Sequence, residues 1–164
     1  MTSNAGRENG NRLQEFVGEW VGEETVAPTP WYPRGGPAIG RTVARMALGG
    51  RVLVTDYVEE RDGKVILEGH GLYAWEAQDV YRLYWFDTSG PAPDAPIEGR
   101  WNDDTLSFER AAPNGRVRYV YSIHHGGDVY DFRIERLKGP ADTLPGAPAA
   151  TWERLMQGLY RRAG

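Results

Sequence analysis

The sequence predicts an all-β protein, a single antiparallel up-and-down β-barrel of about eight to ten strands. Ten short runs alternate polar and apolar residues, and the residues between the runs are those that favour tight turns. Helical periodicity of 3.6 residues is almost absent beyond one short N-terminal segment. An open meander of this many strands leaves two unpaired edges, and closure into a barrel removes both of them.

The breaks between the runs contain residues that tolerate positive φ, as hairpin turns require. Examples are Gly-Gly at 49–50 and 126–127, Asp-Gly at 62–63 and Pro-Asn-Gly at 113–115. Residues 1–10 are small and polar and predict a disordered tail, which leaves 11–164 as one barrel domain. The expected strands are 18–26, 38–47, 51–61, 64–76, 80–87, 96–101, 105–110, 116–125, 128–136 and 151–161.

The segment NRLQEF, residues 11–16, is the expected helical exception. Asn11 is suited to cap a single helical turn, and Leu13 and Phe16 then share one face of it. Such a turn fits across one open end of a barrel, and this predicts a short N-terminal helical turn that closes that end.

Two glycines bracket a lone tryptophan in the next stretch, EFVGEWVGEE. In a barrel, Gly18 permits a sharp bend of the backbone and Trp20 forms the floor. Arg161 or Arg162 of the last strand is expected to lie over the face of Trp20, a cation–π contact that contributes about 0.5–2 kcal/mol.

Composition restricts the classes of function. The net charge of −4 and the isoelectric point near 5.4 give no basic surface for nucleic acid or anionic membrane. The chain has no cysteine, which excludes disulfides, thiolate metal sites and thiol nucleophiles. Neither a signal peptide nor a membrane-spanning run is evident, so a cytoplasmic location is expected. Six Trp and nine Tyr against four Phe suit a half-polar cavity wall.

Alternation along the strands predicts which side chains face the barrel interior. In 116–125, for example, Arg116 and Arg118 face outward, so Val117 and the two tyrosines that follow, Tyr119 and Tyr121, face inward. In 64–76 the glutamates indicate that His70 faces outward, although a polar interior would reverse that assignment. The strand residues predicted to contact a ligand are Tyr57, Tyr73, Trp75, Trp85, Tyr119, Tyr121 and His125.

The segment APTPWYPRGGPA, residues 27–38, is too rich in proline for regular structure but carries Trp31 and Tyr32. It predicts either a lid over the barrel mouth, in which Trp31 contacts the ligand, or a surface loop packed on itself. Both interpretations stay open at this stage.

No G-x-S-x-G, H-E-x-x-H, phosphate-binding or dinucleotide-binding motif is present. The candidate catalytic residues are Asp56, His70 and Asp87, and Glu24 is a further acid–base group on an expected strand. Asp56 interrupts an apolar run, where burial without a partner would raise its pKa, and pairing with an arginine such as Arg45 is the alternative. Asp87 precedes Thr-Ser-Gly, so a role in the turn is its alternative, and His70 is as well suited to a solvent-facing position.

The three histidines do not predict a metal site. His124 and His125 are adjacent, and adjacent residues of a strand point to opposite faces, so they cannot readily bind one ion together. No metal is therefore expected.

Several blocks of the sequence resemble the bacterial DUF1579 family, a calycin-like family of uncharacterised function. They are LQEFVGEWVGEE, LGGRVLVTDY, GHGLYAW, YWFDTSG, EGRWNDDTLSF and the closing YRR, and they span roughly residues 13–162. The resemblance implies a calycin fold, the superfamily of the lipocalins and fatty-acid-binding proteins, whose G-x-W motif and late arginine close the barrel floor. It implies no particular reaction. Nitrobindin-type calycins hold haem through a histidine near the C-terminus, which TWERLMQGLYRR lacks, so no cofactor is expected.

These observations predict a barrel that binds a small, largely apolar molecule, either aromatic or acyl. The alternative is a cofactor-independent enzyme on the same barrel, an isomerase, cyclase or hydrolase, that uses a carboxylate or histidine of the cavity for acid–base chemistry. Nucleic acid and membrane are not expected as partners, and a homodimer stays open.

Overall fold

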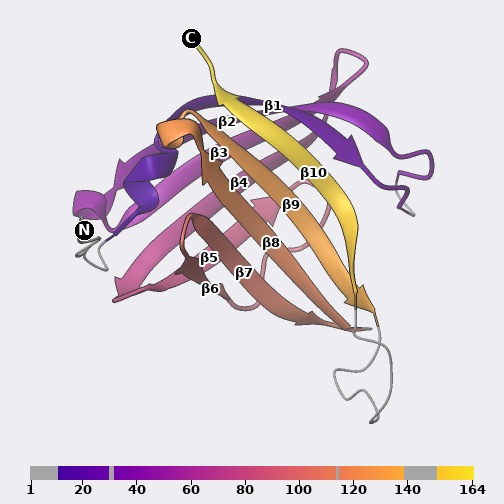
Figure 1. The fold of residues 1–164 in the computed structure, drawn as a ribbon. Helices are drawn as coiled ribbons and strands as arrows, with labels where there is room; N and C mark the ends of the chain where they lie inside the picture. The colour runs from indigo at the N-terminus through magenta and orange to yellow at the C-terminus, as the bar shows by residue number, and fades with distance from the viewer. Residues whose placement is uncertain (1–10, 30–31, 114, 139–150) are drawn as a thin grey trace, which may run out of the picture.

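Ten antiparallel strands close into a barrel in the computed structural model, which describes residues 11–29, 32–113, 115–138 and 151–164 (Figure 1). Each strand pairs with its neighbours in sequence, and the first strand closes the ring by pairing with the last. The strands are β1 (Gly18–Val26), β2 (Gly36–Ala47), β3 (Val52–Arg61), β4 (Lys64–Ala77), β5 (Val80–Asp87), β6 (Ile97–Asn102), β7 (Thr105–Ala112), β8 (Gly115–His124), β9 (Val129–Lys138) and β10 (Trp152–Arg162).

This architecture confirms the predicted fold class, and every expected strand is present with its ends moved by no more than two residues. One of these shifts affects a predicted ligand contact. His125 does not continue β8 but begins the 3-10 turn η3 (His125–Gly127), because Gly126 adopts a φ of 68° and reverses the chain. A second 3-10 turn, η2 (Leu48–Gly50), joins β2 to β3. The expected tail 1–10 lies outside the described residues.

The predicted helical turn is the 3-10 helix η1 (Leu13–Phe16), which lies across one end of the barrel, here called the floor. Leu13 and Phe16 are both buried on its inner side. The Asn11 side-chain oxygen accepts a hydrogen bond from the Leu13 N–H at 3.0 Å, which satisfies a backbone donor at the start of the turn.

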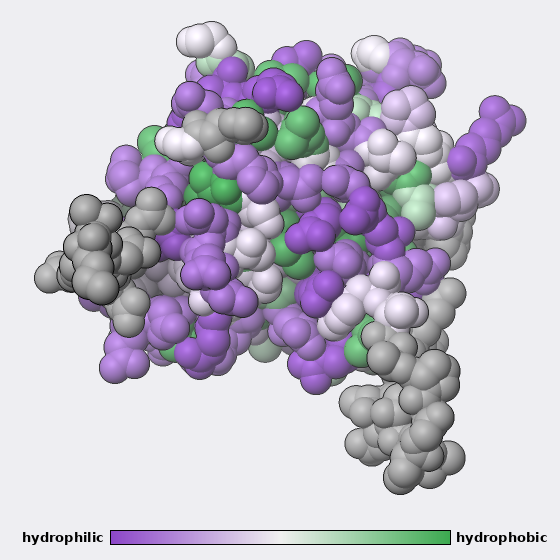
Figure 2. Space-filling model, in the orientation of Figure 1, coloured by the Kyte–Doolittle hydropathy of each residue, from purple (hydrophilic) through white to green (hydrophobic). Residues whose placement is uncertain are grey.

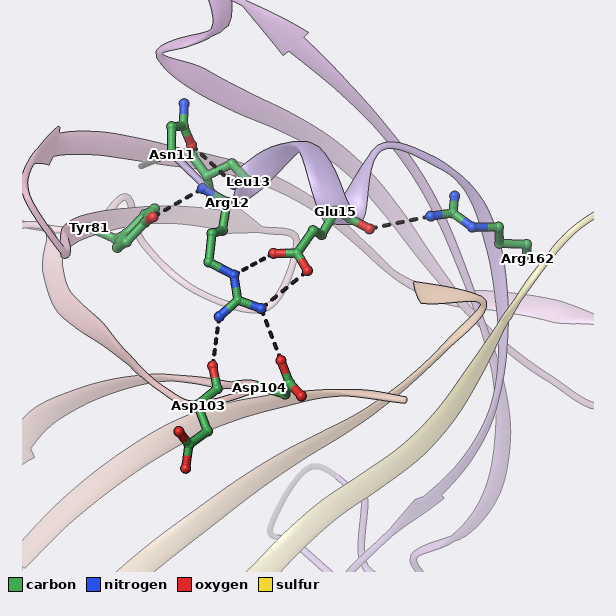
Figure 3. A network of polar contacts seen from close by, with 8 residues as sticks. All are labelled: Asn11, Arg12, Leu13, Glu15, Tyr81, Asp103, Asp104 and Arg162. Atoms are coloured by element: carbon green, nitrogen blue, oxygen red, sulfur yellow. Dashed lines mark hydrogen bonds and ion pairs between the residues drawn. The ribbon is translucent and has the colours of Figure 1, made fainter. Parts of the chain in front are cut away.

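Arg12 ties η1 to the strands around it (Figure 3). Its backbone N–H donates to the Tyr81 hydroxyl at 3.2 Å, and its guanidinium donates to the Asp103 carbonyl at 2.6 Å. The same guanidinium forms ion pairs with Glu15 and Asp104 at 2.6 and 3.2 Å. The helical turn is thereby held to the start of β5 and to the β6–β7 turn.

Trp20 forms the centre of the floor and is only 2% exposed. Its indole N–H donates to the Phe16 carbonyl at 2.9 Å, and the Arg162 guanidinium lies over its ring at 4.2 Å. Arg162 also donates to the Val17 carbonyl at 2.6 Å. Gly18 has a φ of 130°, and a Cβ there would lie 2.7 Å from the Arg162 side chain. The predicted stacking of a late arginine on Trp20 is therefore confirmed, and the residue is Arg162.

Glycines also make room for aromatic rings across neighbouring strands. Gly22 pairs with Tyr160, and a Cβ on Gly22 would lie 2.6 Å from the Tyr160 ring. Gly71 likewise pairs with Trp85, whose ring covers both Gly71 and Gly69. Each ring can therefore lie flat on the inner wall instead of standing across the interior.

The ladder between β5 and β6 covers only the first half of β5. It spans four positions, Val80 to Leu83, although β5 continues to Asp87. Within the described residues, the last part of β5 has no ladder partner on that side. The barrel wall is therefore interrupted beside Trp85 and Asp87, at the end opposite η1, here called the mouth.

Candidate binding cavity

The barrel encloses a cavity of about 270 Å³ between the floor and the mouth. Phe16 and Trp20 form its bottom, and aliphatic side chains such as Leu53 and Leu106 form part of its wall. Five of the aromatic residues predicted to contact a ligand line it, namely Tyr57, Tyr73, Trp85, Tyr119 and Tyr121. Alternation along the strands thus places these side chains in one interior space.

The other three predicted ligand contacts lie elsewhere. Trp75 packs at the edge of the core, its indole N–H donates to the Gln78 carbonyl at 2.9 Å, and it is not part of the cavity wall. His125 lies in η3, outside the strands. Trp31 lies outside the described residues, so its predicted role as a lid stays a prediction.

Asp56 and His70 lie on the outer surface of the barrel. They face each other on β3 and β4, and the Asp56 carboxylate lies 2.8 Å from His70 Nδ1. Their side chains are 68% and 47% exposed, respectively. The outward position of His70 agrees with the prediction. The alternative prediction that Asp56 pairs with Arg45 was wrong. Thr55 and Tyr57 face the cavity, so alternation along β3 turns Asp56 to the solvent, where it lies beside His70.

Asp87 both forms a turn and lines the cavity. It accepts hydrogen bonds from the Ser89 N–H at 2.8 Å and the Ser89 hydroxyl at 2.5 Å, as the turn interpretation predicts. The Trp85 indole N–H donates to its other oxygen at 2.8 Å. Partial burial acts to raise the pKa of Asp87, but these hydrogen bonds outweigh it and hold the pKa below its usual value. Asp87 is therefore a fixed negative charge at the mouth.

Glu24, which the sequence indicates only as a further acid–base group on a strand, is a buried carboxylate. It is 2% exposed and accepts hydrogen bonds from the Tyr57 hydroxyl at 2.9 and 3.0 Å and from the Tyr160 hydroxyl. Burial raises its pKa to about 7, with a further increase from Glu59, while the two tyrosines and Arg61 act to lower it. Glu24 shares strand parity with Trp20, and that signal could have placed it inside the barrel.

A buried ion pair lies next to Tyr57. Glu59 and Arg61 are joined at 3.1 Å, and their side chains are 11% and 5% exposed. Glu59 also approaches the Tyr57 hydroxyl at 3.4 Å. The Arg61 guanidinium lies 3.1 Å from the centre of the Tyr32 ring and donates to the Gly35 carbonyl at 3.4 Å. This contact ties the loop between β1 and β2 to the mouth.

Three other features could indicate a function: a metal site, a membrane-spanning helix and an apolar surface. They contain no group of three or more histidine, aspartate and glutamate side chains arranged to hold a metal ion. In the same part of the chain, no helix is long and apolar enough to cross a membrane. The face shown in Figure 2 is mainly hydrophilic, with only small separate hydrophobic areas. The apolar interior cavity is therefore the candidate site.

The fold and this geometry define the class of protein as a closed antiparallel barrel with an aromatic cavity. No family model matches the chain, and no curated protein matches it. Among solved structures, the crystal structure of Rv2717c from M. tuberculosis is similar, with a TM-score of 0.66 and 16% sequence identity. The similarity covers 93% of this chain and 95% of that one. It supports the fold and, at this identity, nothing further.

Proposed function

We propose that the protein binds a small, largely apolar molecule, aromatic or acyl, inside the barrel. The observation that carries the proposal is the cavity of about 270 Å³, closed at its floor and walled mainly by aromatic and aliphatic side chains. An apolar cavity of roughly 150 Å³ accepts benzene. The barrel therefore has room for a larger ring system or a short acyl chain.

The cavity wall supports binding because its polar atoms have partners within the protein. The hydroxyls of Tyr73 and Tyr121, for example, bond to each other at 2.7 Å in the middle of the wall. A ligand can then bury apolar surface there without stripping these groups of their hydrogen bonds. Unfilled apolar space of this size costs stability, since its lining loses packing contacts. A resident ligand would recover those contacts.

Titration of the purified protein with 1-naphthalenemethanol tests the proposal. We expect saturable quenching of tryptophan fluorescence, because Trp20 and Trp85 line the cavity, and a rise in Tm with ligand concentration. Native mass spectrometry of freshly purified protein is expected to detect a co-purified molecule.

Two neighbouring substitutions on β2 locate the site. Ala44 lines the cavity, whereas Val43 is half exposed on the outer face. Ala44→Phe fills the cavity and should weaken binding at least about tenfold, and Val43→Phe should leave binding unchanged. Circular dichroism and a melting curve establish that both variants fold. If a folded Ala44→Phe variant binds like the wild type, the cavity is not the binding site.

A cofactor-independent enzyme on the same barrel is the second candidate, and Glu24 is the observation that favours it. Its carboxylate has a pKa of about 7 and contacts the hydroxyls of Tyr57 and Tyr160, which both line the cavity. A group that titrates near neutrality suits acid–base catalysis. Incubation of the protein with the co-purified molecule distinguishes the two functions. Chemical conversion that Glu24→Gln abolishes while binding persists supports the enzyme, and an unchanged molecule supports the binding protein.

A further inference from the structure

Two polar side chains of the cavity wall, those of Tyr57 and Asp87, lie at the mouth in one row across three strands. Tyr57 on β3 pairs with Gly69 on β4, and Gly69 pairs with Asp87 on β5. All three positions face inward, and neighbouring strands lie about 4.8 Å apart. Tyr57 and Asp87 therefore lie at the same height in the wall, with a position between them that carries no side chain.

The Trp85 ring occupies the space that Gly69 leaves. A Cβ on Gly69 would overlap the six-membered part of that ring, so the ring lies flat over the glycine. The indole N–H is held by Asp87 at 2.8 Å, and the ring is tilted by 56° to Tyr57 with the ring centres 5.9 Å apart. Two aromatic faces are thus fixed beside a carboxylate at the end of the cavity.

The charged side chains that line the cavity in the described part of the chain are Glu59 and Asp87, both carboxylates. Glu24 adds a third carboxyl group behind Tyr57. Asp87 forms no ion pair with any described residue, and its hydrogen bonds come from the neutral donors Ser89 and Trp85. Its negative charge therefore has no basic partner in this part of the structure.

Three arginines near the mouth are engaged by other groups or exposed to solvent. Arg61 is engaged by Glu59, Tyr32 and the Gly35 carbonyl. Arg136 pairs with Glu153 at 2.9 Å. Arg110 reaches the Tyr119 hydroxyl at 3.4 Å, but its side chain is exposed, so solvent and salt screen its charge. None of these three arginines lines the cavity.

We propose that the ligand of this cavity carries a cationic nitrogen, which lies against Trp85 and Tyr57 with Asp87 as its counter-ion. This inference rests on the proposed binding function and names the chemical class of the ligand, a hydrophobic amine. An ammonium group within about 6 Å of an aromatic face is attracted by the ring quadrupole. A carboxylate ligand at the same place is repelled by Asp87, whose charge no described basic side chain neutralises.

Three probes of nearly equal size and different charge test the inference by isothermal titration calorimetry. At pH 7, 1-naphthylmethylamine is a cation, 1-naphthalenemethanol is neutral and 1-naphthoate is an anion. We expect the amine to bind most tightly and the naphthoate most weakly, with at least about tenfold between them. The Asp87→Asn variant should lose most of the preference for the amine and keep its affinity for the alcohol.

Asp56→Asn is the matched control, because it removes the same charge from the outer surface of the neighbouring part of the wall. It should leave all three affinities unchanged, which separates a local effect from attraction to a protein of net charge −4. Equal affinity for the three probes, a preference for the naphthoate, or a preference for the amine that survives in Asp87→Asn overturns the inference while the binding function stands. Failure of all three probes to bind overturns both.

Discussion

The floor and the mouth of the barrel are built on opposite principles. At the floor, Trp20 and Phe16 are buried, and the charged Arg162 lies above the tryptophan and binds backbone carbonyls. At the mouth, by contrast, Glu24 and Glu59 are buried next to each other around Tyr57. The floor keeps charge at the surface and apolar area inside, whereas the mouth places carboxyl groups inside.

This difference predicts different roles for the two ends of the barrel. Burial of a large aromatic ring stabilises the folded state, while burial of carboxyl groups costs free energy unless they are well partnered. Groups that are costly to bury and that titrate near neutrality gather at functional sites. The floor is therefore expected to dominate the free energy of unfolding, and the mouth is expected to dominate its pH dependence and ligand selection.

The largest expected effect is at the floor. Trp20→Ala should lower the free energy of unfolding by about 3–5 kcal/mol, because it removes a buried aromatic side chain and leaves a cavity. Urea unfolding at pH 7 measures the change. A loss below about 1 kcal/mol would mean that the floor does not hold the barrel closed.

The next effect is at the mouth and depends on pH. The pKa of Glu24 is raised from 4.5 to about 7, so the folded state favours its protonated form. Its contribution to stability is complete below pH 4.5 and is lost as the pH rises to above about 7, a difference of about 3 kcal/mol. The titratable groups that act on the Glu24 carboxyl are Tyr57, Tyr160, Glu59 and Arg61.

Urea unfolding between pH 4.5 and 8 measures this effect as the difference between the wild type and Glu24→Gln. The variant should lack this part of the pH dependence and become the more stable protein at pH 8. Glu23→Gln, the same substitution at the exposed neighbour on β1, should follow the wild type. Parallel curves for the wild type and Glu24→Gln would contradict the buried position of Glu24.

A smaller effect returns to the floor. Arg162→Ala removes the cation–π contact with Trp20 and the hydrogen bonds to backbone carbonyls, and it should cost about 1–2 kcal/mol. In a double-mutant cycle, Arg162→Ala should couple to Trp20→Ala. Arg161 is exposed, so Arg161→Ala should neither lower the stability nor couple to Trp20→Ala. If Arg162→Ala and Arg161→Ala lower the free energy of unfolding equally, stacking on Trp20 does not stabilise the fold.

The smallest effect lies on the outer wall. Asp56 and His70 are paired but exposed, and exposed ion pairs contribute little because water and salt screen them. Asp56→Asn should change the free energy of unfolding by less than about 0.5 kcal/mol. A larger loss in urea unfolding would place this pair among the structural contacts of the barrel.

Much of the fold could be predicted because local patterns determine it. Turn residues such as Asp62-Gly63 limit the strands, and Gly18 with Trp20 marks the floor. Long-range contacts were harder to predict. The stacking of Arg61 on Tyr32 joins β3 to the β1–β2 loop, and no spacing in the sequence indicates that pairing.

Only part of the candidate site could be predicted, because strand alternation is local and the contacts of Glu24 are long-range. Alternation placed Trp85 and Tyr121 on the inner wall, but it was not applied to Asp56, which consequently stayed a candidate although it faces solvent. Glu24 was named only as a further acid–base group on an expected strand, because no local pattern distinguishes it as the most deeply buried carboxylate. Its burial depends on the Tyr57 and Tyr160 hydroxyls, which come from distant parts of the chain.

The central claim, that the interior binds a small apolar molecule, is tested most directly by NMR of the complex with 1-naphthalenemethanol. Leu53 and Leu106 line the cavity and are almost fully buried, whereas Val43 and Val65 are exposed on the outer surface. We predict intermolecular nuclear Overhauser effects from the naphthalene protons to the methyl groups of Leu53 and Leu106, and none to those of Val43 and Val65. Contacts to the two valines alone would show that the ligand binds outside the barrel and would contradict the claim.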